Sequence, residues 1–347
     1  RAAFPPIEEL TFERIAFPRP GLIRVHMVNG GPEPVTVAQV MLDDAYWEHT
    51  VVPDREVGRL DGIVIEISYP WVDGDPLIVT VVSSTGVTFT QEVAVATQSP
   101  EINRSYIVTF ALLGVYVGVV PVFLGLLWLP FIAGVSQRWI DFFLSFTVGL
   151  LLFLGVDALE GAFALTGQVA SAFQGVGLIV LGVVGAPLVI HAVGRIGRGD
   201  SAITPLGIST LIAIGIGLHN LGEGLAIGSS YAVGEVALGT SLVFGFLLHN
   251  TTEGLGIVAP LARSRPSYGK LAALGLIAGV PTIFGAWIGG FSYSPTASVL
   301  FLAIGAGAIV QVIAVLGRSM GSGGREGFKG PLNAAGVVAG LIVMYAT

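Results

Sequence analysis

Residues 219–224 read HNLGEG and residues 249–254 read HNTTEG, and both stretches lie inside long apolar runs. Each copy has a His, an Asn directly after it, and a Glu four positions after the His. Because an α-helix turns about 100° per residue, positions i and i+4 lie on the same helix face. Each copy therefore presents an imidazole and a carboxylate together.

These groups predict a metal site. Burying a carboxylate in lipid costs several kcal/mol, so ionisable residues within a membrane usually face a partner or an ion pathway. Imidazole and carboxylate together suit divalent transition metals. We expect a cage of four ligands: His219, Glu223, His249 and Glu253. The alternative is a hydrogen-bonded network that only holds the helices together.

The composition is that of an integral membrane protein. The mean hydropathy is +0.82, and 11% of residues are charged, against about 25% in a typical soluble protein. The chain has no Cys, so neither disulfides nor thiolate metal ligands are expected. The expected partners are the lipid bilayer and divalent metal ions, with no nucleic acid. The start at Arg1, without a Met, suggests a removed signal peptide or a trimmed start.

The charge divides the chain into two parts. Residues 1–105 hold 15 acidic and 7 basic residues, a net charge of −8, and residues 106–347 hold 8 acidic and 9 basic residues, a net charge of +1. Segments 22–28, 35–40 and 77–82 have strand composition and are separated by turn signals. We predict a small all-β, sandwich-like domain over 1–105 and a transmembrane domain over 106–347.

The second part predicts a polytopic α-helical fold with eight transmembrane helices. We place them at 107–129, 139–162, 174–194, 204–228, 236–261, 271–291, 297–317 and 331–346. The fourth and fifth helices carry the two motifs and run antiparallel. This predicts a pseudo-twofold axis in the membrane plane, the inverted repeat of many transporters.

The loops predict the orientation. Every Lys and Arg after residue 106 falls in loops 1–2, 3–4, 5–6 or 7–8: Arg138, Arg195, Arg198, Arg263, Arg265, Lys270, Arg318, Arg325 and Lys329. The alternate loops carry none, which is a positive-inside pattern. We expect a prokaryotic plasma-membrane protein with the β domain and the C-terminus outside.

At these residues the chain resembles the ZIP (Zrt-, Irt-like) family of divalent metal transporters, particularly its GufA-like bacterial and archaeal branch. The resemblance covers residues from about 107 to 347 and rests on the eight helices, the outside termini and the paired motifs. It implies a transporter rather than an enzyme, with zinc the first choice of cargo and iron, manganese, cobalt or cadmium as alternatives. It also implies a homodimer. The β domain lies outside the resemblance.

The resemblance assigns roles to particular residues. The His and Glu residues of both motifs would bind the transported metal, and Asn220 and Asn250 would serve an adjacent second site bridged by the two Glu residues. Relatives often have Pro before the motif Glu, where this chain has Gly222 and Thr252. Relatives also often carry an acidic ligand on the sixth helix, where residues 279–282 read GVPT.

Three further polar residues are candidates for the metal pathway. Asp157 and Glu160 are three positions apart on the second helix, and some ZIP relatives have a similar Asp-Ala-Leu stretch there. We expect Asp157 along the path and Glu160 nearer the outer entrance; the alternative is a solvated pair at the helix end. Gln311 on the seventh helix is a weaker candidate. Gly224 and Gly254 are expected to serve close helix packing.

Three rival functions remain at this stage. A membrane metallohydrolase would use the same His and Glu set with an activated water. A metal sensor would use the β domain for its output. A proton or sodium pathway would use the carboxylates alone. The short loops carry no nucleotide-binding motif, so we expect transport to follow gradients.

Overall fold

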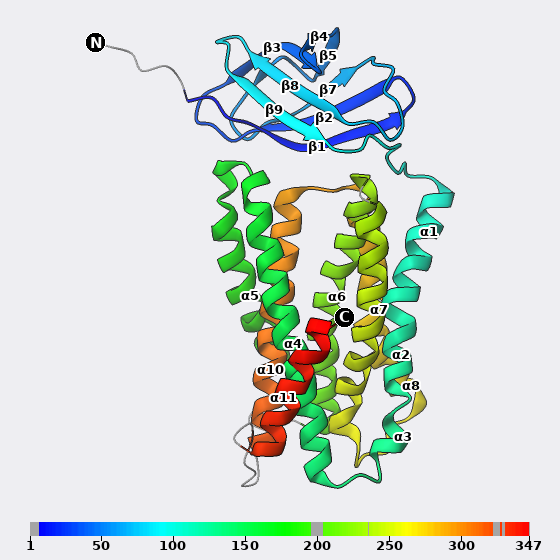
Figure 1. Ribbon diagram of the computed structural model, residues 1–347. Coiled ribbons are helices and arrows are strands. Elements are labelled where there is room, and N and C mark those ends of the chain that lie inside the picture. The colour runs from blue at the N-terminus through cyan, green and yellow to red at the C-terminus, as the bar shows by residue number, and fades with distance from the viewer. Residues whose placement is uncertain (1–6, 196–203, 235, 322–326, 328–329, 347) are drawn as a thin grey trace, which may run out of the picture.

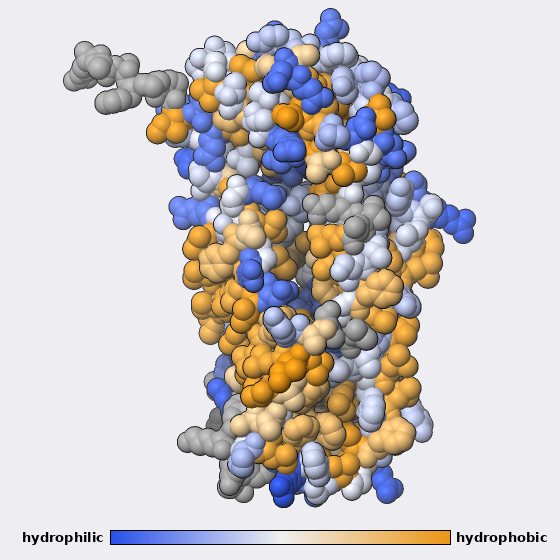
Figure 2. Space-filling view, viewed as in Figure 1, coloured by the Kyte–Doolittle hydropathy of each residue, from blue (hydrophilic) through white to orange (hydrophobic). Residues whose placement is uncertain are grey.

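The computed structural model describes residues 7–195, 204–234, 236–321, 327 and 330–346, and it consists of a β sandwich on one end of a helical bundle (Figure 1). The chain passes from the sandwich to the bundle once, through residues 94–103, which form neither helix nor strand. On the face drawn in Figure 2, hydrophobic side chains cover most of the bundle, and hydrophilic ones gather on the sandwich and at the opposite end. The all-β N-terminal part expected from the sequence is confirmed.

The β sandwich has two antiparallel sheets. The first has the order β1 (Leu10–Arg19), β2 (Leu22–Asn29), β7 (Gly62–Ile67), β5 (His49–Val52). The second has the order β4 (Ala45–Tyr46), β3 (Val35–Leu42), β8 (Leu77–Ser83), β9 (Thr88–Val93), with β6 (Glu56–Val57) also paired to β3. Alternate residues such as Ile23 and Val25 of β2 and Val79 and Val81 of β8 are buried in one shared core.

The bundle is built from a series of apolar helices. They are α1 (Arg104–Gly114), η1 (Val115–Val119), α2 (Val120–Leu126), α3 (Leu129–Ile132), α4 (Gln137–Leu165), η2 (Thr166–Gln168), η3 (Ser171–Phe173), α5 (Gly175–Arg195), α6 (Pro205–Ala232), α7 (Val236–Val258), η4 (Ala259–Leu261), α8 (Tyr268–Gly279), α9 (Pro281–Phe291), α10 (Pro295–Gly321) and α11 (Pro331–Ala346). Consecutive helices α1–α3 form one span and α8–α9 another.

Seven helical spans among the described residues are long and apolar enough to cross a membrane. The eighth expected helix forms, but α11 has 16 residues and is only about 24 Å long at about 1.5 Å per residue. The hydrocarbon core of a bilayer is about 30 Å thick. The last helix thus has the bounds expected for it from the sequence, and it is shorter than the seven spans that are long enough to cross a bilayer.

Glycines let the motif helices approach their neighbours closely. A Cβ on Gly224 of α6 would overlap the carbonyl of Thr282 on α9, and a Cβ on Gly285 of α9 would overlap the carbonyl of Leu221 on α6. Gly254 of α7 likewise meets the backbone of α2. The packing role expected for Gly224 and Gly254 is confirmed, and it fixes both motifs against adjacent helices.

We predict that Gly224→Ala destabilises the bundle, because the added methyl has only backbone to displace. Gly222→Ala is the matched control, since a Cβ there would lie 3.8 Å from the nearest atom and Ala favours a helix over Gly by about 1 kcal/mol. Thermal unfolding in detergent should show a lower midpoint for Gly224→Ala and an equal or higher one for Gly222→Ala. Equal midpoints for both variants would contradict this packing.

A second prediction concerns the β sandwich, where burial and the nearby Arg14 and Arg24 lower the pKa of His26. His26 then takes up a proton at a higher pH in the unfolded chain than in the folded chain. Its contribution to the free energy of unfolding is therefore fully present above about pH 6.5 and is lost as the pH falls below that value. The hydrogen-exchange protection factors of the β2 amides, which correct for the slower intrinsic exchange at lower pH, should therefore fall below that pH. His26→Gln should remove this part of the pH dependence; an unchanged dependence would refute the assignment.

Candidate metal centre

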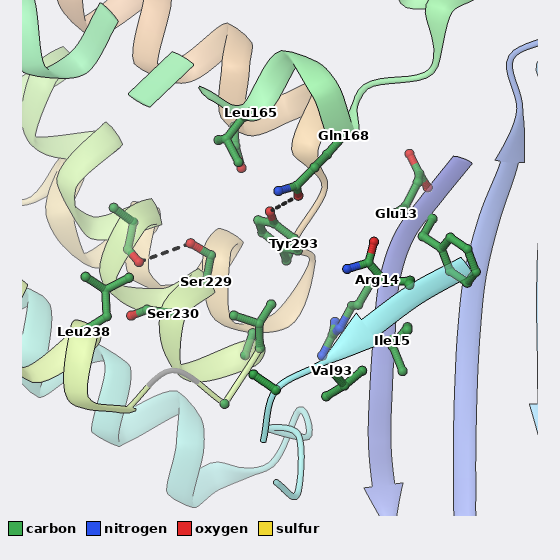
Figure 3. Close-up of a pocket in the computed structure, with 18 of the residues that line it drawn as sticks. Glu13, Arg14, Ile15, Val93, Leu165, Gln168, Ser229, Ser230, Leu238 and Tyr293 are labelled. Carbon is green, nitrogen blue, oxygen red and sulfur yellow. Dashed lines mark hydrogen bonds between the residues drawn. The ribbon is translucent and has the colours of Figure 1, made fainter. Parts of the chain in front are cut away.

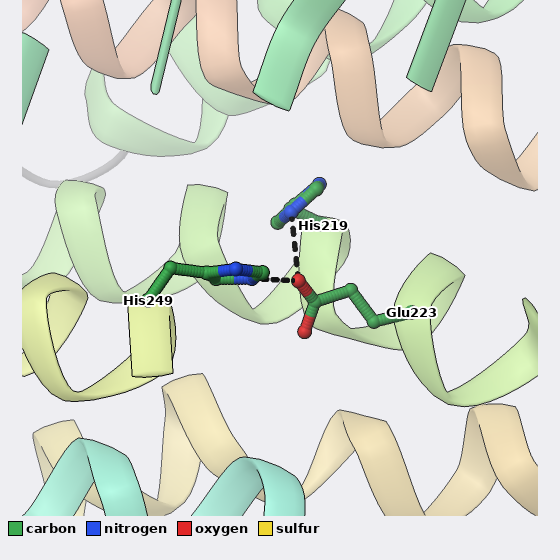
Figure 4. Close-up of side chains that lie close together, drawn as sticks. All are labelled: His219, Glu223 and His249. Atoms are coloured by element: carbon green, nitrogen blue, oxygen red, sulfur yellow. Dashed lines mark hydrogen bonds and ion pairs between the residues drawn. The ribbon is translucent and has the colours of Figure 1, made fainter. Parts of the chain in front are cut away.

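The two motifs bring three of their side chains together between α6 and α7 (Figure 4). The Nε2 atom of His219 lies 3.2 Å from Oε1 of Glu223, one turn along the same helix. The Nε2 atom of His249, from the antiparallel helix, contacts the same carboxylate oxygen. One ligand atom from each residue lies within 4.8 Å of the others. As expected, His219 and Glu223 lie on one face of α6. His249 approaches the same carboxylate from α7.

This cluster is shielded from solvent. The exposed fractions of His219, Glu223 and His249 are 7%, 4% and 5%. The ring of Phe246 packs edge-on against that of His249, with centroids 5.4 Å apart. A carboxylate that is buried away from water stays ionised only if nearby groups stabilise its negative charge. In the described structure the two imidazoles supply part of that stabilisation.

Asn250 supplies a further contact and ties the cluster to the first span. Its Nδ2 atom donates to Oε2 of Glu223 at 3.0 Å and to the carbonyl of Val117 at 3.0 Å. Val117 stands four residues before Pro121, which has no N–H to donate to it. The carbonyl that Pro121 leaves without its usual helical partner thus becomes the anchor for Asn250, in a span that contains the π-helical segment η1.

Asn220 occupies the matching place in the first motif. Its Nδ2 atom donates to the carbonyl of Ala278 at 3.1 Å, three residues before Pro281, where α8 gives way to α9. The Oδ1 atoms of Asn220 and Asn250 are buried and accept no hydrogen bond. The Asn of each motif therefore makes the same kind of contact. Its side-chain Nδ2 donates to a backbone carbonyl of a span that contains a proline, and its Oδ1 accepts no hydrogen bond in the described structure.

Glu253 lies deeper than the sequence pattern suggests. It is 1% exposed, and neither of its carboxylate oxygens has a hydrogen-bond donor among the described residues. It is not part of the group of three that the described residues form. Three residues of the expected cage of four therefore meet, and Glu253 interacts electrostatically with all three without joining them. Buried acceptor oxygens without donors are rare, and a cation would satisfy them.

The pathway candidates fall in different places. Asp157 on α4 interacts electrostatically with Glu160 and with the three cluster residues, yet both carboxylate residues are exposed on the bundle surface. Gln311 on α10 is half-buried and is not among the metal-ligating residues that the described structure gathers. Asp157 thus lies within electrostatic range of the cluster, and its place on the metal path stays a prediction, whereas nothing in the described structure connects Gln311 to the cluster.

Sequence reasoning missed one close neighbour of the cluster. A Cβ on Gly305 of α10 would lie 3.3 Å from Cα and 3.8 Å from Nδ1 of His219. A larger residue would press on the imidazole, so Gly305 sets the room available to it. The two carbonyl anchors were also missed, although Pro121 is a readable signal that the carbonyl four residues earlier, that of Val117, loses its α-helical donor.

The donor set fits a divalent transition metal. Two imidazole nitrogens and carboxylate oxygens are ligands that zinc takes in proteins, usually four at about 2.0–2.2 Å. In this structure the two Nε2 atoms face the Glu223 oxygen directly, so a metal would replace those contacts by bonds to itself. No protein-family model matches the chain, and a search of curated proteins finds no match either.

We predict that Asn250→Ala destabilises the protein by about 1–3 kcal/mol, the cost of leaving a buried polar group unsatisfied. The substitution removes the donor to both the Glu223 carboxylate and the Val117 carbonyl. Thr251→Ala is the matched control, because the Thr251 hydroxyl bonds only to the Leu247 carbonyl of its own helix in the described structure. Reversible unfolding in mixed micelles measures both variants, and equal losses would contradict the anchoring role of Asn250.

Proposed function

We propose that this protein is a transporter of divalent transition-metal ions of the ZIP type, with zinc as the first-choice cargo. The observation that carries the proposal is the buried meeting of two imidazoles and a carboxylate, contributed by two antiparallel helices in the middle of an apolar bundle. A second buried carboxylate and two free amide oxygens lie in the same motifs. A hydrogen-bonded network that served only helix packing would not leave those acceptors without donors.

The matched surroundings of the motifs support an inverted repeat. The first motif is bonded to the α8–α9 span and the second to the α1–α3 span, each through Asn and each beside a proline. Each motif also packs through its final glycine on the same span, Gly224 on α9 and Gly254 on α2. We therefore infer that these two pairs of spans are related by a pseudo-twofold axis and that they move relative to α4 and α10 during transport.

The distribution of charge supports an orientation in a plasma membrane. The acidic β sandwich is on one end of the bundle, and the connections between α3 and α4 and between α7 and α8 are at the other (Figure 1). Arg138 is in the first turn of α4, Arg263 lies between η4 and α8, and Lys270 is in the first turn of α8. Arg198, Arg325 and Lys329 lie outside the described residues. We propose that the sandwich is outside the cell, where its negative charge raises the local concentration of cations.

Burial favours transport over hydrolysis. A hydrolase needs room for a substrate at its ligands, whereas the cluster side chains are at most 7% exposed and packed between helices. Asp157 and Glu160 are exposed carboxylate residues on α4, and Asp157 interacts electrostatically with the cluster residues, so both would favour a cation on its way to the cluster. Conformational change would then open the cluster to either side of the membrane.

The proposal predicts saturable zinc uptake into proteoliposomes that depends on the cluster. His249→Ala and Glu223→Gln should each reduce initial uptake by at least about tenfold, roughly the 1.4 kcal/mol of one lost ligand interaction. His191→Ala is the matched control, because His191 is an exposed imidazole of α5 outside the cluster. Equal uptake by all variants, or cleavage of a substrate without uptake, would overturn the proposal.

A further inference from the structure

A cavity of about 930 Å³ separates the β sandwich from the mouth of the bundle (Figure 3). Strands β1 and β9 form one wall, and the neighbouring ends of α4, α6, α7 and α10 form the other. Its polar lining residues include Glu13, Arg14, Glu92, Ser229, Ser230 and Ser298. The hydroxyl of Ser298 is buried and has no hydrogen-bond partner.

The floor of this cavity lies close to the His219–Glu223–His249 cluster. Leu302 of α10 lines the cavity. Gly305 follows Leu302 by three residues on the same helix, and a Cβ on Gly305 would lie 3.3 Å from Cα of His219. Ala226, three residues after Glu223 and on the same face of α6, also lines the cavity. About one helix turn therefore separates the cavity floor from the cluster residues.

Two polar contacts hold the sandwich over this cavity. The backbone N–H of Ser171, between α4 and α5, donates to Oε1 of Glu9 at 2.7 Å, and the Ser171 hydroxyl donates to the other oxygen. The Arg14 guanidinium donates to the carbonyl of Phe291, at the end of α9, at 3.2 Å. The contacts join two separate points on the bundle rim, and the connection through residues 94–103 has no regular structure.

We propose that the cavity is the outer antechamber of the metal route and that the β sandwich is its cap, held closed by Glu9 and Arg14. This inference rests on the proposed transport function. A hydrated divalent cation would enter the antechamber when the two contacts release, attracted by the acidic sandwich. It would lose water at the floor beside Leu302 and pass to His219, Glu223 and His249. The cap therefore limits access to the cluster and does not itself select the metal.

Labelling kinetics test the cap without reference to transport. The chain has no Cys, so Ser229→Cys places a single thiol in the antechamber. In full-length protein in nanodiscs, reaction with a cationic methanethiosulfonate reagent should be slow and should quicken several-fold when Glu9→Gln and Arg14→Gln are added. Glu33→Gln makes the same change at an exposed carboxylate and should have no effect. Equal rates in all backgrounds would overturn the proposal.

A separate thiol checks that the variants remain folded. Val81 is 0% exposed in the sandwich core, so Val81→Cys should react equally slowly in every background. If it also quickens with Glu9→Gln and Arg14→Gln, the sandwich itself has loosened, and the proposed release of an intact cap is wrong.

Locking the cap tests whether its release is needed for transport. A Cβ on Gly30 would lie 2.9 Å from that of Ala170, and a small shift would bring it into the range of about 3.5–4.5 Å found in disulfides. The Glu9 carboxylate must move aside, since it occupies that space. Oxidised Gly30→Cys/Ala170→Cys protein should lose most of its zinc uptake and regain it on reduction, whereas the single variants should not respond.

The outcomes separate the two proposals. Undiminished uptake by the oxidised double variant would overturn the cap. Absence of uptake in the parent protein would overturn the transport function, and the labelling rates would still decide whether the sandwich closes the antechamber.

Discussion

The structure depends on placing the Glu223 carboxylate in the middle of an apolar bundle. A charge there loses its hydration, and only close partners make the position tolerable. His219, His249 and Asn250 are those partners. They come from two helices that run in opposite directions, so α6 and α7 must be held in a fixed axial position relative to each other. Much of the surrounding architecture serves that requirement.

Prolines that interrupt neighbouring helices, together with glycines, hold α6 and α7 in this relative axial position. Pro121 leaves the Val117 carbonyl without its usual helical partner, and Asn250 takes that place. Asn220 makes the corresponding contact beside Pro281. Gly224 and Gly254 allow the backbones of α6 and α7 to touch those of α9 and α2. The same residues that make the helices locally irregular therefore position the cluster side chains, and a helix with a donating residue at position 121 would give the Val117 carbonyl its usual partner in place of Asn250.

Periodic patterns in the sequence predicted the helices and strands, whereas features that depend on contacts between distant segments were missed. Apolar runs and turn signals located the β part and the helices, because burial in lipid or in a sandwich core demands them. The i, i+4 spacing placed His219 beside Glu223. It did not show that Glu253 lies outside the group of three, since that depends on the rotation of α7 against α6. The room at Gly305 and the cavity under the sandwich arise from contacts between distant segments, which no local pattern encodes.

Zinc K-edge X-ray absorption of the full-length protein, loaded with one equivalent of zinc, tests the central claim most directly. The account predicts a first shell of nitrogen and oxygen at about 2.0–2.2 Å, with outer-shell scattering from two imidazoles that falls to one in His249→Ala. A spectrum without imidazole scattering, or one unchanged by that substitution, would show that the metal does not bind between His219 and His249.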